Sequence, residues 1–265
     1  MPLPVPLAAP LAAPLAAPLA APLAALAALA LAAALLAPAP AWATACDVPA
    51  EVVSAARPLP ATARALQRGS LRILILGSGS ITGPGASGPD ASWPARLQAL
   101  LAARFPGRPV EVALRGGRGV SVHDHLALLR DGLNAETPAL VLWQAGTVEA
   151  VRGLDPDDMG ETMRQGLERI RRAGADIIIL DQQYSRFLRA NTNIEPYRDK
   201  LRLVAAAAGA PLFRRYDLMQ HWVDSGALDL ERTARGDRGA AMDRLNDCLA
   251  KALVELIGQG VAEAR

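Results

Sequence analysis

Five short apolar runs place the strongest limit on what this chain can fold into. Four consist mainly of leucine and β-branched residues and the fifth is weaker; they are Leu71–Leu76, Val110–Leu114, Ala139–Gln144, Asp176–Leu180 and Pro211–Phe213. Runs of this length and composition are typical of strands that are buried on both faces of a parallel sheet. The sequence therefore predicts a mainly parallel five-stranded sheet covered on both sides.

Longer amphipathic stretches alternate with these runs and predict helices. They are Ala61–Gln67, Trp93–Arg104, Val122–Leu133, Pro156–Ala173, Ile194–Ala208 and Ala240–Ile257. Strand–helix alternation with right-handed crossovers gives a three-layer α/β/α sandwich. In such folds the chemistry collects in the loops that follow the strands, here residues 77–92, 115–121, 144–154, 181–193 and 214–239.

Residues 1–45 differ from the rest of the chain because they contain no Asp, Glu, Lys or Arg. Pro-Leu-Ala-Ala repeats five times from Pro6 to Ala25, and Leu23–Ala37 is a run of leucine and alanine only. That run is short for a membrane span but matches the apolar region of a secretory signal, and Ala43-Thr44-Ala45 matches a cleavage site. We expect a signal peptide over 1–45, although no basic residue precedes the apolar run. The alternative is a Pro/Ala-rich tail without a targeting role.

All 54 charged residues lie after residue 45, so about a quarter of that part is charged, as in an ordinary globular domain. This composition excludes a polytopic membrane protein and a disordered chain. The net charge is only +2 and the basic residues are scattered, which argues against a nucleic-acid partner. We expect a lead-in over 46–70 and one domain over 71–265.

The chain has two cysteines, Cys46 and Cys248. Cleavage after Ala45 would leave Cys46 at the mature N-terminus, and in an oxidising compartment the pair suggests one disulfide. A lipid anchor on Cys46 is the alternative, but Ala43 stands where such a signal usually has Leu. The disulfide is preferred, and with it a periplasmic or secreted location.

The first loop, Gly77-Ser-Gly-Ser-Ile-Thr-Gly-Pro-Gly85, is rich in small residues that can turn sharply and point N–H groups at an anion. A dinucleotide fingerprint would need glycine where Thr82 stands. A phosphate-binding loop would need a lysine, and a nucleophile elbow fits no serine here. These failures leave a nucleotide-binding protein as the weakest hypothesis. What remains is a serine displayed after the first strand.

The chain resembles the SGNH (GDSL) hydrolase family, serine esterases with a flavodoxin-like fold. Four further segments carry the resemblance: Leu114-Arg-Gly-Gly-Arg-Gly119, Leu142-Trp-Gln-Ala-Gly-Thr147, Ile178-Ile-Leu-Asp-Gln-Gln-Tyr184 and Asp237 through Ala250. The resemblance implies that Ser80 is the nucleophile, that Gly119 donates a backbone N–H to the oxyanion, and that Asp237 belongs to the catalytic set.

Two positions depart from the family pattern. Val148 stands where the third motif has an asparagine whose side chain completes the oxyanion hole, and Ala240 stands where the last motif has the histidine base. Losing one oxyanion donor typically costs about 10²–10³ in rate, and losing the base costs more. The catalytic set that the resemblance implies is therefore incomplete.

Only a few residues could replace the missing base. The three histidines of the chain, His123, His125 and His221, are candidates, and Glu149 is a weaker one. Gln144 could donate near an oxyanion, but as a strand-end residue it is more typical of packing. No spacing of His, Cys and acidic residues suggests a metal site, so no cofactor is expected.

Two functions follow from these residues. One is an extracytoplasmic ester hydrolase that removes acyl or acetyl groups from a small molecule or a glycan, with Ser80 as nucleophile and a relocated base. The other is an inactive family member that binds a ligand or a partner in the cell envelope. The losses at Val148 and Ala240 favour the second.

Overall fold

The computed structural model describes residues 46–50 and 57–264. The expected signal peptide, 1–45, lies outside these residues. No helix in the described ranges is long and apolar enough to cross a membrane.

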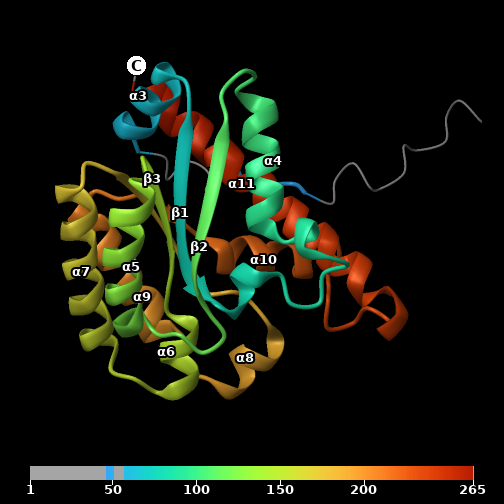
Figure 1. Ribbon diagram of the computed structural model, residues 1–265. Coiled ribbons are helices and arrows are strands. Elements are labelled where there is room, and N and C mark those ends of the chain that lie inside the picture. Colours follow the sequence, from blue (N-terminus) through green and yellow to red (C-terminus); the bar gives the residue numbers. More distant parts are fainter. Residues whose placement is uncertain (1–45, 51–56, 265) are drawn as a thin grey trace, which may run out of the picture. The chain divides into compact units, whose positions relative to one another are not determined.

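The core of the fold is one parallel sheet (Figure 1). Its strands are β1 (Leu71–Ser78), β2 (Val110–Gly117), β3 (Leu140–Gln144), β4 (Asp176–Leu180) and β5 (Leu212–Phe213). Their spatial order is β2-β1-β3-β4-β5 and every pairing is parallel. This is the flavodoxin-like order, which reverses direction between β1 and β3. The predicted five-stranded parallel sheet is confirmed.

The helices form the two outer layers. They are α3 (Pro60–Arg68), α4 (Trp93–Arg104), α5 (Val122–Glu136), α6 (Thr147–Arg152), α7 (Pro156–Arg172), α8 (Arg186–Asn191), α9 (Glu195–Ala208), α10 (Arg215–Asp224) and α11 (Arg238–Glu263). Short 3₁₀ turns occupy Gly79–Thr82, Pro89–Ala91 and Arg235–Asp237. In Figure 1, α5, α7 and α9 cover one face of the sheet, and α4 and α11 cover the other.

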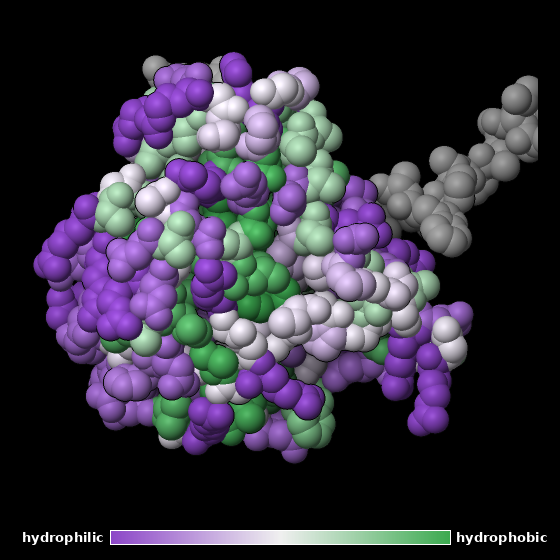
Figure 2. Space-filling view, in the orientation of Figure 1, coloured by the Kyte–Doolittle hydropathy of each residue, from purple (hydrophilic) through white to green (hydrophobic). Residues whose placement is uncertain are grey.

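The two sides of the sheet bury two separate apolar clusters. Ile73, Ile75 and Leu142 pack in one cluster, together with α4 and α11 side chains. Leu74 and Trp143 pack in the other, with side chains of α5, α7 and α9. This division follows from the period of two in a strand, which sends neighbouring side chains to opposite faces. The outer surface of α5 and α7 is hydrophilic, and apolar side chains reach the surface in a central recess (Figure 2).

Several elements differ from the sequence prediction. β1 and β2 continue two and three residues beyond the predicted runs, because the glycines at their ends allow close pairing: a Cβ on Gly116 would lie 2.0 Å from the Gly77 carbonyl oxygen. Three short helices, α6, α8 and α10, stand in segments that the prediction left as loops. α6 and α8 have six residues each and α10 has ten, which is shorter than the stretch of about 11–18 residues over which a helical repeat can be recognised.

Cys46 and Cys248 form a disulfide. Cys248 is buried on α11, and the lead-in is fixed next to it because Trp222 on α10 donates a hydrogen bond of 2.7 Å to the Asp47 carbonyl oxygen. The predicted disulfide is confirmed, and it uses the sulfur that a lipid thioether would need.

Candidate functional site

Ser80 lies in the crevice where the strand order reverses. It belongs to the 3₁₀ turn that directly follows β1, and the turn requires glycine at its entry: a Cβ on Gly77 would lie 2.5 Å from Ile81 Cγ2 and 3.2 Å from Gln144 Cβ. Gly83 ends the turn with φ 67°, in the left-handed region that favours glycine. In open α/β sheets, this crevice is where ligands bind.

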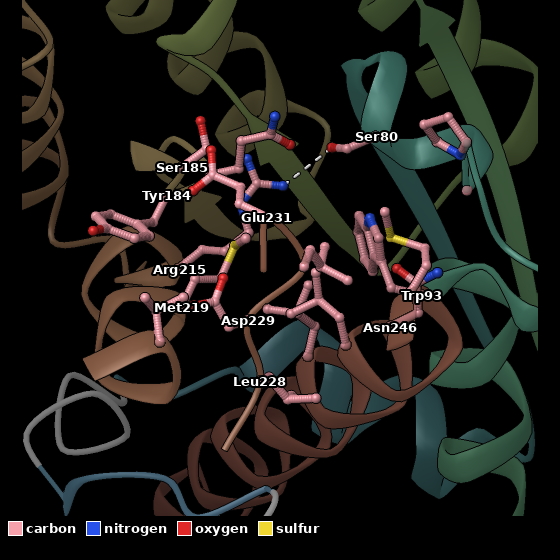
Figure 3. Close-up of a pocket in the computed structure, with 18 residues that line it drawn as sticks. Ser80, Trp93, Tyr184, Ser185, Arg215, Met219, Leu228, Asp229, Glu231 and Asn246 are labelled. Carbon is pink, nitrogen blue, oxygen red and sulfur yellow. Dashed lines mark hydrogen bonds between the residues drawn. The ribbon is translucent and has the colours of Figure 1, made fainter. Parts of the chain in front are cut away.

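The hydroxyl of Ser80 has two side-chain partners. It donates a hydrogen bond of 2.8 Å to Gln144 Oε1 and accepts one of 3.1 Å from Arg215 Nη1. The amide of Gln144 also donates 3.0 Å to Ser78 Oγ, so the end of β3 holds both serines. Figure 3 shows Arg215 approaching Ser80 across the pocket. The Ser80 proton therefore points at an amide oxygen, which is not a base.

Arg215 is a buried cation with unused donors. Its side chain is 2% exposed, and its Nε and Nη2 atoms have no hydrogen-bond partner. Burial lowers the pKa of Arg215 to about 10, while the nearby Asp181 charge opposes the shift, so the guanidinium stays protonated at neutral pH. No direct ion pair joins it to Asp181.

Asp181 lies behind Arg215 at the end of β4. Its Oδ1 accepts a hydrogen bond of 2.9 Å from the Tyr216 N–H. Burial raises the pKa of Asp181 to about 7, and the Tyr216 N–H and the charge of Arg215 offset only part of that effect. The carboxyl is therefore much less acidic than an exposed aspartate, and it balances the positive charge of Arg215 only in part.

An apolar cavity of about 240 Å³ opens on one side of Ser80 (Figure 3). Ser80 and Arg215 lie at one end of it. Its walls are apolar side chains, including Trp93, Met219, Val223, Leu228, Leu230, Met242, Leu245 and Leu249. Asp229 and Glu231 also line it, but both carboxylates are already bound by Arg186. The cavity suits an apolar group next to a polar end at Ser80.

A more open groove of about 510 Å³ lies on the other side of Ser80. It is lined by Ser80, Gly119 and Val148. Gly119 has φ 78°, in the left-handed region that favours glycine. The structure thus brings the expected nucleophile, the expected oxyanion donor and the substituted asparagine position to one surface. Its further polar lining consists of Ser78, Arg118, Thr147, Arg152, Gln183 and Ser185, and no acidic residue takes part.

The last motif contributes apolar side chains such as Met242 and Leu245 to the cavity, but not its two catalytic positions. Asp237 and Ala240 are exposed at the start of α11, and neither lines the cavity or the groove. Within the described ranges, no hydrogen bond or ion pair joins Asp237 to any of the three histidines. Its assignment to a catalytic set stays a prediction of the resemblance.

None of the three histidines lines the cavity or the groove at Ser80. His125 accepts a hydrogen bond of 3.0 Å from Trp143 Nε1. Trp143 points to the face of the sheet opposite to Gln144, the partner of Ser80, because the two residues are adjacent on β3. Burial lowers the pKa of His125 to about 4, against the smaller opposing effects of the Gly77 backbone and Asp124.

The other candidate bases are also occupied or remote. His123 is exposed on α5, and His221 Nε2 lies 3.7 Å from Asp47 Oδ2 on a side chain that is 40% exposed. Glu149 is buried and accepts hydrogen bonds from the backbone N–H groups of Val122 (2.7 Å) and Gly146 (2.9 Å). Its contacts are those of a group that fixes the start of α5 and α6.

Sequence reasoning missed Arg215 as a partner of Ser80 and ranked Gln144 as a packing residue. Gln144 could have been weighed more heavily, since it ends the strand next to β1. Arg215 gave no signal beyond its place in the loop after β5, because its contact with Ser80 spans 135 residues.

A five-stranded flavodoxin-like sheet with a serine displayed after β1 defines the SGNH-type hydrolase fold. The particular family follows from the sequence: residues 45–263 match the Non-GDSL lipase-like family, and the chain belongs to it. The resemblance to the SGNH hydrolases is thereby confirmed. Among the described residues no group of three or more His, Cys, Asp or Glu side chains could hold a metal ion.

Solved structures support the same fold. The crystal structure of TesA is 24% identical, with a TM-score of 0.55, and covers 70% of this chain and 99% of TesA. The acetylxylan esterase Axe2 of Geobacillus stearothermophilus is 19% identical, with a TM-score of 0.56, and covers 72% of this chain and 95% of Axe2. The psychrotrophic esterase EstA from Pseudoalteromonas is 16% identical, with a TM-score of 0.51, and the match covers 69% of this chain and 98% of EstA. No curated protein sequence matches the chain significantly.

Proposed function

We propose that this protein is a ligand-binding member of its family that does not hydrolyse esters by the family's mechanism. The observation that carries the proposal is the hydrogen bonding of Ser80. Its proton is directed at the amide oxygen of Gln144, and its oxygen accepts from the cation of Arg215.

Neither partner can remove the serine proton. An amide oxygen is too weak a base, and a guanidinium has no lone pair to accept a proton. In serine hydrolases the base and its orienting acid act as a unit, and removing the nucleophile or the base costs about 10⁶ in turnover. The groove also lacks the side-chain donor that Val148 replaces, worth about 10²–10³ in rate.

The cavity and the groove support binding. Together they present apolar walls and a small number of polar groups that converge on Ser80, which is the usual composition of a small-molecule site. The Cys46–Cys248 disulfide supports an extracytoplasmic location, since such bonds persist in oxidising compartments. The signal peptide expected over 1–45 fits the same location.

A second candidate function is hydrolysis of acyl or acetyl esters with a different proton acceptor. The observation in its favour is that Ser80 and Gly119 line one groove. Arg215 would stabilise a Ser80 alkoxide, but the proton would have to leave to solvent. The two proposals differ in whether Ser80 is reactive.

The test is hydrolysis of p-nitrophenyl acetate by the mature protein and by its Ser80→Ala variant, with Ser78→Ala as the matched control. We expect all three to hydrolyse the ester at one background rate. A fluorophosphonate probe, which labels only activated serines, should leave Ser80 unmodified. Hydrolysis that disappears only in Ser80→Ala, or labelling of Ser80, would establish the second function instead.

A further inference from the structure

Three arginines from separate parts of the chain line the cavity and the groove that meet at Ser80. Arg215 comes from the start of α10 and contacts the serine oxygen at 3.1 Å. Arg118 follows β2 and lies against the serine turn, because a Cβ on Gly79 would be 3.6 Å from Arg118 Cα. Arg152 ends α6, and its Nη2 would be 3.2 Å from a Cβ on Gly119.

The positive charge of this group is only partly balanced, by the buried Asp181 behind Arg215. Arg118 and Arg152 are exposed, and in the part of the chain that the structure describes neither lies within salt-bridge distance of an acidic residue. Arg215 is buried, and two of its nitrogens have no partner. The acids nearest to the cavity, Asp229 and Glu231, are held by Arg186 instead.

An unpaired buried guanidinium is costly, and a bound anion would supply the missing acceptor. Arginine is also the side chain whose planar set of donors best matches the oxygens of phosphate and carboxylate. Ser80 adds a hydroxyl that can turn its proton from Gln144 towards an anion. The site therefore has both the charge and the donors of an anion receptor.

Apolar surface continues from this cationic centre on both sides. The cavity of about 240 Å³ has mainly apolar walls, so it can take up an alkyl group. On the open side, Val151 and Phe187 line the groove and are 58% and 69% exposed. A ligand that satisfies both regions is amphiphilic.

We infer that the site at Ser80 binds a tetrahedral oxyanion that carries an apolar group, such as an alkyl phosphate monoester, with Arg118, Arg152 and Arg215 as its anchors. This inference rests on the proposed binding function and names its ligand class. A dianion with three terminal oxygens can meet donors from three directions, whereas a carboxylate offers two oxygens in one plane. The apolar group would lie in the cavity or along Val151 and Phe187.

The experiment is calorimetric titration of the mature protein with hexyl phosphate, compared with hexanoate, 1-hexanol and inorganic phosphate. We expect 1:1 binding of hexyl phosphate, weaker binding of hexanoate and of inorganic phosphate, and the weakest binding of 1-hexanol. Raising the salt concentration should weaken the binding of hexyl phosphate, because ionic screening acts on the exposed arginines.

The variants are Arg118→Gln and Arg152→Gln, chosen because both side chains are exposed and their loss should not affect folding. Each should weaken the binding of hexyl phosphate about tenfold, and the double variant more. Arg202→Gln is the matched control, an arginine on α9 whose side chain is 41% exposed and bound to Asp199. It should bind as the unmodified protein does.

Equal affinity for hexyl phosphate and 1-hexanol would overturn the inference, and so would unchanged binding in the double variant. Equal affinity for hexanoate and hexyl phosphate would contradict the inferred preference for a tetrahedral head group. The proposed function fails on a different result, Ser80-dependent ester hydrolysis. If the protein neither hydrolyses esters nor binds the anion, the inferred ligand class is wrong, whereas the proposed absence of hydrolysis still holds.

Discussion

Arg215 donates a hydrogen bond of 3.1 Å from Nη1 to the hydroxyl oxygen of Ser80, which lies 135 residues earlier in the chain. In this contact a cation, and not a neutral base, is the partner of the serine that the family pattern marks as the nucleophile. A cation can stabilise negative charge on the serine or on a ligand, but it cannot take up a proton. The same hydrogen bond therefore explains why we expect no ester turnover at Ser80 and why we expect an anionic ligand there.

The missing catalytic groups can be restored by substitution. Val148 lines the groove with Ser80, so Val148→Asn adds an amide donor there, and Ala240→His adds an imidazole three residues after Asp237. Because one oxyanion donor alone is worth about 10²–10³, we expect the double variant to hydrolyse p-nitrophenyl acetate at least about tenfold faster than the unmodified protein.

The control for this gain is Val151→Asn combined with Ala240→His. Val151 lines the same groove on the same helix but lies outside the family motif. It should give no increase, and Ser80→Ala should abolish the rate of the active double variant. If the Val148 and Ala240 substitutions together give no gain, the match of these positions to the family motifs is wrong.

The fold could be predicted from sequence because each strand is marked locally by its apolar run. All five predicted strands are present, and the helix Trp93–Arg104 has the predicted bounds. The limits of β1 and β2 could not be predicted, because they depend on the Gly77–Gly116 pair, a contact between strands. α11 extends beyond the prediction to Glu263 because its buried stripe continues through Gly260, which packs closely against Leu59.

Only the part of the site that follows directly from the order of the strands could be predicted from the sequence. Ser80, Gly119 and Val148 follow strands directly, so topology alone brings them together. The partner of His125 depends on which way Trp143 points, and the partner of Ser80 depends on where α10 begins. Both are properties of packed side chains, and no local pattern records them.

Removal of the disulfide should destabilise the fold strongly. The bond closes a loop of 202 residues, and the chain-entropy model gives about 5 kcal/mol for a loop of this length, as an upper value. We expect Cys46→Ser to lower the free energy of unfolding by several kcal/mol in urea titrations without reductant. The Cys46→Ser/Cys248→Ser double variant should lose a similar amount. A reductant should lower the stability of the unmodified protein and leave the single variant unchanged; equal stability of all forms would contradict this account.

Asp181 should make the protein less stable as the pH rises from about 4 to about 7. The native state keeps the Asp181 proton up to a pKa of about 7, whereas the unfolded chain releases it near 3.8, so in this interval only the native state binds the proton. Asp181 makes its full contribution to the free energy of unfolding at low pH. This contribution, at most about 4 kcal/mol, is lost as the pH rises towards 7. In Asp181→Asn, the stability relative to the unmodified protein should rise with pH. A difference that stays constant between pH 4.5 and 8 would contradict the assignment.

His125 should have the opposite effect over nearly the same interval. Its native pKa is lowered to about 4 from 6.5, so between these values the unfolded chain binds more protons. Its contribution is full above pH 6.5 and is lost as the pH falls towards 4, by at most about 3 kcal/mol. His125→Asn keeps an acceptor for Trp143 Nε1 and removes this titration. Urea titrations of this variant should therefore show a stability that falls more steeply with rising pH than that of the unmodified protein, because Asp181 then acts alone. An unchanged slope would contradict the prediction.

Gly166 on α7 should not tolerate alanine, although alanine favours helices. The gain in helix propensity is about 1 kcal/mol. A Cβ at this position would lie 2.2 Å from Cη2 of Trp143, a side chain that is 0% exposed and cannot move without disturbing the core. Overpacking of this kind costs about 1–3 kcal/mol, so the cost exceeds the gain and Gly166→Ala should lower the melting temperature.

Gly258→Ala on α11 is the matched substitution, because the nearest atom to its Cβ would be Arg104 Nε at 3.9 Å, an ordinary contact. It should raise the free energy of unfolding by up to about 1 kcal/mol, since only the helix propensity changes. Comparing the melting temperatures of the two variants with that of the unmodified protein therefore separates the cost of overpacking from the gain in helix propensity. If both variants shift the melting temperature in the same direction, the close packing of α7 on Trp143 does not limit the stability of the fold.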